Sequence, residues 1–182
     1  MRLIAMAVVT ALALAACSPG NEGWLVPEPA VGVMIDQRKG ATIAAEIRDS
    51  DLIVRVGGTW ASQGHQALDL TYRNTGPVPQ RVALASLGIT LRGETAMLDT
   101  LDDVTGVDVS KPGNTAVPRT LIAGTAPPSL VIPPGEARAV LARFANFRAD
   151  PRIGVGDTVE ITVPLATTAR RLFFTAERVV LP

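Results

Sequence analysis

Hydrophobic and polar residues alternate with a period of two over several stretches of this chain. Every second residue is apolar in residues 68–73, and residues 158–163 and 52–56 repeat the pattern. Successive side chains of a strand point to opposite faces of a sheet, so this alternation predicts strands with one buried and one solvated face. Between residues 82 and 91 the phase shifts, which predicts a β-bulge near Ala85 and Ser86.

Turn residues separate these stretches. Pro134–Gly135 predicts a type II turn, Arg92–Gly93 predicts a hairpin, and residues 74–77 (Asn-Thr-Gly-Pro) predict the end of a strand. Residues 41–48 fit either a single helical turn or a further strand. Roughly seven to nine strands with frequent turns indicate an all-β protein, and we expect an antiparallel β-sandwich.

The first residues have a different pattern. Residues 3–16 carry no charge and follow Met1-Arg2. This run is shorter than the roughly 20 apolar residues of a membrane-spanning helix. A positive start, a short apolar run and small residues at its end are typical of a secretory signal peptide.

The end of this run, Leu14-Ala15-Ala16-Cys17, resembles the lipobox of bacterial lipoproteins. The resemblance implies that the Cys17 thiol is alkylated with diacylglycerol, that the chain is cut before Cys17, and that the new amine receives a fatty acid such as palmitate. It divides the chain into a signal peptide (residues 1–16), the anchored Cys17 with a flexible tether (residues 17–30), and the β-sandwich (residues 31–182). The alternative is an ordinary signal peptide with a chance cysteine.

Cys17 is the only cysteine, so the chain itself offers no partner for a disulfide. In the enterobacterial sorting pattern, Asp after the cysteine retains a lipoprotein in the inner membrane. Ser18 therefore favours a lipid-anchored protein of the bacterial cell envelope, in the outer membrane and facing the periplasm. The lipid bilayer is then one expected partner.

Two further segments together resemble the immunoglobulin-like domains of bacterial envelope proteins. Residues 68–84 contain a strand that ends in Asn-x-Gly, and residues 129–144 contain a Pro-Gly turn between two apolar stretches. In those domains the chain crosses between two sheets after the first motif. The resemblance implies an immunoglobulin-like sandwich, although the paired core cysteines of antibody-type domains are absent. No named family follows from it.

Charge and composition exclude some functions. Lys plus Arg and Asp plus Glu both number 17, so the chain lacks the basic surplus of a non-specific nucleic-acid binder. The single histidine, His65, has no second histidine or free thiol with which to bind zinc, and no Gly-x-Ser-x-Gly motif accompanies it. We expect Met34 and Met97 to pack in the core rather than to bind copper. We therefore predict no catalytic residue, metal or cofactor.

Three features remain as candidate binding elements. Trp60 follows Gly57-Gly58 and is either a loop aromatic that binds a small ligand or glycan, with His65 nearby, or a core side chain. Residues 101–128 break the strand rhythm and form either an interaction segment or a passive loop. Four acids there and just before it allow calcium binding or a solvated loop, and we favour the loop; they are Asp99, Asp102, Asp103 and Asp108.

The sequence thus predicts a non-catalytic envelope lipoprotein whose tethered β-sandwich mediates interaction with an unknown envelope protein or supports envelope structure. A small-ligand or glycan-binding module that uses Trp60 is the alternative. An enzyme of unknown class is the third hypothesis.

Overall fold

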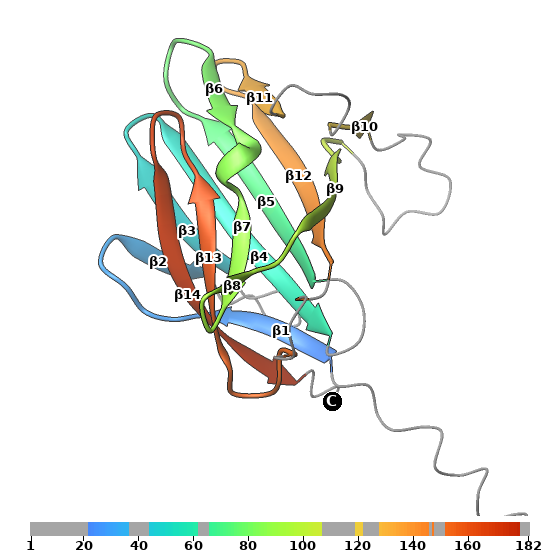
Figure 1. The fold of residues 1–182 in the computed structure, drawn as a ribbon. Helices are drawn as coiled ribbons and strands as arrows, with labels where there is room; N and C mark the ends of the chain where they lie inside the picture. Colours follow the sequence, from blue (N-terminus) through green and yellow to red (C-terminus); the bar gives the residue numbers. More distant parts are fainter. Residues whose placement is uncertain are drawn as a thin grey trace, which may run out of the picture.

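The computed structural model describes residues 22–36, 44–61, 66–106, 119–121, 128–145, 147 and 152–178. These residues form fourteen β-strands and one short 3-10 turn, so the all-β prediction is confirmed (Figure 1). The strands are β1 (Glu22–Pro27), β2 (Val33–Asp36), β3 (Ala44–Asp49), β4 (Leu52–Ala61), β5 (Gln66–Asn74), β6 (Gln80–Ala83), β7 (Gly88–Leu91), β8 (Glu94–Thr95), β9 (Leu98–Asp103), β10 (Arg119–Thr120), β11 (Ser129–Ile132), β12 (Ala137–Phe144), β13 (Thr158–Pro164) and β14 (Ala169–Arg178).

The predicted number of strands, seven to nine, was too low for a simple reason. Several strands have only two to four residues, among them β2, β8 and β10. Such strands are too short for a period of two to stand out in the sequence. They lie at the edges of the fold, where short strands are common.

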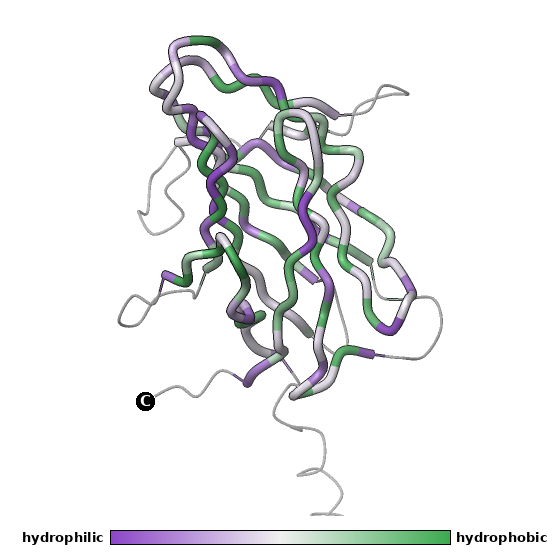
Figure 2. The backbone as a smooth tube through the Cα atoms, turned by 90° about the vertical axis from the view of Figure 1, so that its left-hand side faces the viewer, coloured by the Kyte–Doolittle hydropathy of each residue, from purple (hydrophilic) through white to green (hydrophobic). Residues whose placement is uncertain are grey.

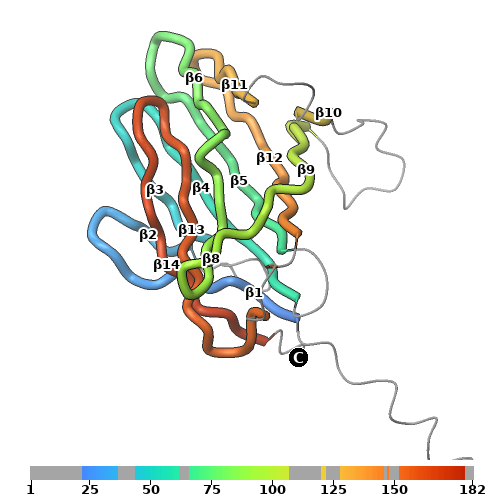
Figure 3. Tube along the Cα trace, in the orientation of Figure 1, coloured from blue at the N-terminus to red at the C-terminus, as the bar shows by residue number. Residues whose placement is uncertain are grey.

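Twelve of the strands join into one antiparallel sheet, in the order β10-β9-β12-β5-β4-β1-β14-β13-β7-β8, with β3 and then β2 attached to β4. The sheet folds over so that β13, β14 and β7 lie in front of β3, β4 and β5 (Figures 1 and 3). A separate pair, β6 and β11, lies at one end of the fold (Figure 1). The inner faces share one hydrophobic core, and hydrophobic and hydrophilic positions alternate along the strands (Figure 2).

Strand β1 connects the two layers and occupies part of the region predicted to be a tether. Residues 22–24 pair with the end of β4, and residues 23–27 pair with the end of β14. Leu25 is fully buried, and a Cβ atom at Gly23 would lie only 1.7 Å from the carbonyl oxygen of Glu177. A flexible tether over residues 17–30 is therefore wrong for residues 22–27, which are part of the sheet.

The predicted turns are confirmed. Gly135 has a φ of +74°, and the amide of Glu136 donates a hydrogen bond of 3.2 Å to the carbonyl three residues earlier. These are the features of a type II turn with proline at its second position. Arg92 and Gly93 both have positive φ, +50° and +87°, and connect β7 to β8 as a two-residue hairpin. Strand β5 ends at Asn74 as expected.

The predicted bulge near Ala85 and Ser86 is wrong. Residues 84–86 form a 3-10 turn between β6, which pairs with β11, and β7, which pairs with β13. The phase of the alternation shifts because the chain changes its partner strand at this turn. Of the two alternatives for residues 41–48, the strand is correct from Ala44 onward, and residues 41–43 lie outside the described part.

Candidate functional site

The predicted anchor lies outside the described residues. Leu14, Ala15, Ala16 and Cys17 precede Glu22, where the described chain begins, so lipidation remains a prediction. Within the described residues, no helix is long and apolar enough to span a bilayer. Strand β1 begins only five positions after Cys17.

Trp60 is a core residue. It lies on β4, only 1% of its surface is exposed, and its Nε1 donates a 3.0 Å hydrogen bond to the carbonyl oxygen of Glu177 on β14. The ring therefore presents no face to a ligand, and its one polar group is already bonded. This arrangement is the core alternative and contradicts the use of Trp60 as an exposed binding residue. His65 lies outside the described residues.

The glycines before Trp60 serve packing rather than loop mobility. A Cβ atom at Gly58 would lie 2.8 Å from Leu68 Cδ2 and 2.9 Å from the carbonyl oxygen of Ala67. Such contacts are too close for a side chain, so glycine lets β4 approach β5. The sequence contained a signal for this, because the alternation of Leu52, Val54 and Val56 continues through Gly58 to Trp60.

Residues 101–128 are only partly irregular. Residues 101–103 belong to β9, which pairs with β12, and residues 119–120 form β10, which pairs with β9. Residues 107–118 and 122–127 lie outside the described part. The prediction that the whole segment departs from strand structure is thus wrong at both of these places. The sequence did not reveal them because the two strands contribute only a few residues to the segment.

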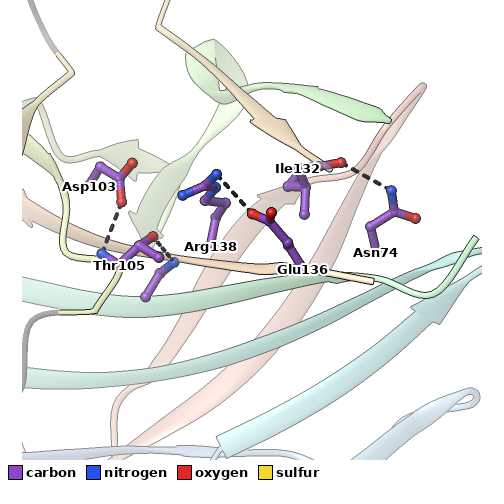
Figure 4. Close-up of polar contacts among 7 residues, drawn as sticks. Asn74, Asp103, Thr105, Ile132, Glu136 and Arg138 are labelled. Atoms are coloured by element: carbon purple, nitrogen blue, oxygen red, sulfur yellow. Dashed lines mark hydrogen bonds and ion pairs between the residues drawn. The ribbon is translucent and has the colours of Figure 1, made fainter. Parts of the chain in front are cut away.

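The acids of this segment make separate contacts. Asp102 Oδ2 lies 3.3 Å from the guanidinium of Arg143, and its Oδ1 accepts a hydrogen bond from Thr120. Asp103 Oδ1 instead accepts the amide of Thr105, whose hydroxyl oxygen in turn accepts the amide of Ala139 (Figure 4). These contacts extend the β9–β12 pairing past the last strand residue. Within the described ranges, no three His, Cys, Asp or Glu side chains come together as metal ligands. Asp108 lies outside those ranges.

Asn74 is one of two buried polar side chains among the described residues. It is fully buried, its Nδ2 donates to the carbonyl oxygens of Val78 (2.7 Å) and Ile132 (3.0 Å), and its Oδ1 accepts the amide of Gly76 (2.9 Å). Figure 4 shows the bond to Ile132, which joins the end of β5 to β11. The Asn74 side chain therefore helps to fix the direction of the chain after β5. The sequence analysis identified the turn but not this role.

Like Asn74, Glu28 joins separate strands through side-chain hydrogen bonds that the sequence did not reveal. It follows β1, and its Oε1 accepts hydrogen bonds from the hydroxyls of Thr158 (3.1 Å) and Thr175 (3.0 Å). The two threonines face each other across β13 and β14. Glu28 thus fixes the end of β1 on the outer surface of this layer.

Two ionisable groups have altered pKa values. Burial raises the pKa of the Asp69 carboxyl, and the nearby Arg143 guanidinium only partly opposes this. Asp69 is an exposed residue on the outer face of β5, and its partners on the neighbouring strands are Gly57 and Leu141. Burial also raises the pKa of Tyr72, whose hydroxyl has no hydrogen-bond partner among the described residues.

The prediction that Met34 and Met97 pack in the core is wrong. Their exposed fractions are 48% and 57%. Met34 lies on the edge strand β2, and Met97 lies in the link between β8 and β9, so both are outside the two inner faces.

Comparisons with known proteins found no matching family model, no matching curated protein and no matching solved structure. The fold and the residues themselves are therefore the basis for a functional proposal.

Proposed function

We propose that the protein is a non-catalytic lipoprotein of a bacterial cell envelope. In this proposal acylated Cys17 anchors it in the outer membrane, and its immunoglobulin-like β-sandwich faces the periplasm and binds another envelope protein. The observation that carries the proposal is the complete lipobox, Leu14 to Cys17, at the end of a short uncharged run. The start of β1 at Glu22 supports it, because a folded domain follows the anchor directly.

Two or three acyl chains on one residue are enough for stable attachment. Each buried methylene contributes about 0.8 kcal/mol, and a single chain binds membranes only marginally. Diacylglycerol on the thiol together with an acyl chain on the amine exceeds that threshold. The absence of a second cysteine from the sequence is compatible with an exported domain whose only thiol is consumed by the lipid.

For the interaction with a protein partner, the edge of the sheet at β9 is the best candidate. β9 pairs with β12 on one side; on the other, among the described residues, it contacts only the two-residue β10 and the amide of Leu121. Residues 107–118 connect these two strands and contain three valines and two prolines. Segments that contain several valines suit pairing with a strand of a partner.

The anchor is tested with Cys17→Ser. The variant should remain an unprocessed precursor and incorporate no labelled fatty acid, while the matched control Ser18→Ala should be processed and labelled like the wild type. Labelling of the Cys17→Ser variant at the wild-type level would refute the anchor. Ser18→Asp adds a test of location, because it should move the protein to the inner membrane where the enterobacterial sorting pattern applies.

The partner surface is tested by replacing residues 107–118 with a Gly-Ser linker of equal length. This change leaves the paired residues 119–120 in place, so thermal stability should stay close to that of the wild type. Envelope proteins that crosslink to the wild type in membranes should be lost from the variant. A folded variant that retains every crosslinked protein would place the binding surface elsewhere.

A further inference from the structure

The structure defines two ends of the sandwich. β1 begins at Glu22, beside Ala61 at the end of β4, and Gly23 pairs with Arg178 at the end of β14. We call this the proximal end; β1 and the end of β14 meet there (Figure 1). The distal end contains the Asn74 corner and the turn at Gly135, which meet through a backbone hydrogen bond of 3.0 Å. β4, with ten residues, runs from one end to the other, so the ends lie roughly 30 Å apart.

The chain between the anchor and the domain is short compared with this length. Five residue steps separate Cys17 from Glu22 and span at most about 17 Å when fully extended. A lipid on Cys17 would therefore hold the proximal end within that distance of the membrane surface. The distal end could touch the same bilayer only if the whole domain lay flat.

The exposed apolar side chains near the proximal end include Val155. Val155 lies in the turn from Gly154 to Asp157, and 55% of its surface is exposed. The amide of Gly156 donates a 2.8 Å hydrogen bond to the carbonyl of Ala176 on β14, whose partner in β1 is Leu25. This turn therefore lies beside the pairing of β1 and β14, close to the point where the chain from the anchor enters the fold.

The Val155 turn is fixed in place. The carboxylate of Asp157 accepts the amide of Gly154 at 2.9 Å through Oδ2 and pairs with Arg92 at 2.8 Å through Oδ1. Arg92 belongs to the β7–β8 hairpin, so the turn is tied to a second element as well as to β14. A side chain held at the tip of a rigid turn needs no reorganisation to enter a lipid head-group layer.

We infer that the proximal end of the sandwich rests on the bilayer that holds acylated Cys17, with Val155 in the head-group region and the Asn74 corner directed away from the membrane. This inference rests on the proposed lipid anchor and adds the orientation of the domain. It follows that a protein partner has access to the distal end and to the β9 edge, but not to the end near β1.

The test uses the fact that acylation consumes the only native thiol. Val155→Cys in the full-length acylated protein provides one reactive thiol for an environment-sensitive NBD fluorophore. Val78→Cys is a matched control, because Val78 is also 55% exposed but lies at the distal end, where its carbonyl bonds to Asn74. Both proteins are reconstituted into phosphatidylethanolamine–phosphatidylglycerol vesicles that carry a lipid with a spin-labelled head group.

We expect the fluorophore at position 155 to shift to shorter wavelength and to lose at least half of its emission to the spin label. The fluorophore at position 78 should lose less than a tenth. Equal quenching at both positions would mean that the domain lies flat, and quenching at neither would mean that it is held away from the lipid; either result overturns the inference while leaving the anchor intact. Protein that carries no lipid and does not float with the vesicles would overturn both the anchor and the inference.

Discussion

Replacing Asn74 with alanine should strongly destabilise the domain. The substitution removes three hydrogen bonds, two donated to carbonyls that lie 4 and 58 residues away in the sequence and one accepted from Gly76. Asn74 is completely buried, and its bonds to Ile132 and Gly76 are buried as well, while the bond to Val78 is only partly buried. The bond to Ile132 also fixes β11 against the end of β5.

The expected magnitude follows from these contacts. A hydrogen bond contributes about 1 kcal/mol net, so the loss of three should lower the free energy of unfolding by about 3 kcal/mol. For a domain of this size, that corresponds to a fall in melting temperature of roughly 6–12 °C. Thr75→Ala is a suitable control, because it removes one exposed hydrogen bond, to Asp51, and should change the stability by about 0.5 kcal/mol or less.

Urea denaturation of a soluble form that begins at residue 18, followed by circular dichroism, would measure these differences. Asn74→Asp separates hydrogen bonding from volume, since it keeps the acceptor for Gly76 but places an oxygen against the carbonyls of Val78 and Ile132. It should be at least as unstable as Asn74→Ala at neutral pH. A stability of Asn74→Asp equal to that of the wild type would refute the assigned role of Nδ2.

Three further predictions concern β1 and the two altered pKa values. Gly23→Ala should lower the free energy of unfolding by roughly 2 kcal/mol or more, because its Cβ would collide with the carbonyl of Glu177. The control Gly88→Ala should be tolerated, since its Cβ would meet Thr95 at an ordinary 3.6 Å. Equal urea midpoints for the two variants would contradict the place of β1 in the sheet. Tyr72→Phe should be as stable as the wild type or more stable in thermal melts, since it removes a buried hydroxyl with no partner in the described part of the chain; a clear loss would reveal an unrecognised bond. The raised pKa of Asp69 means that the folded state binds this proton more tightly than the unfolded state, so the charge reduces stability as the pH rises from about 4 through the raised folded pKa. Asp69→Asn should therefore match the wild type near pH 3.5 and have the higher melting temperature at about pH 7, and the opposite trend would contradict the direction of the shift.

The longer strands could be predicted from the sequence because their pattern is local. In β5 and β13 the buried and solvated faces alternate over six or more residues, so the period of two identifies them directly. β1 escaped detection because its composition, with Gly, Trp and Pro in six residues, is similar to that of a linker. Its strand structure depends on pairing with β4 and with β14, and β14 lies about 150 residues away in the sequence.

For the candidate site residues, too, local patterns could be predicted from the sequence, but contacts between residues distant in the sequence could not. The even-numbered alternation in β4 extends to Trp60, so its burial could have been inferred, and the neighbouring glycines drew attention to a loop instead. The role of Asn74 could not have been inferred from its neighbours alone, because one of its acceptors, the carbonyl of Ile132, is distant in sequence. The motif that resembles a lipobox lies entirely within residues 14–17, which is why the sequence alone was sufficient to propose the anchor.

The most direct test of the central proposal, a lipid-anchored domain, is the mass of the N-terminal peptide from protein purified out of membranes. We predict a peptide that begins at Cys17 and carries the added masses of diacylglycerol on the thiol and a fatty acid on the amine. A peptide that contains unmodified Cys17, or a mature N-terminus at any other residue, would contradict the proposal.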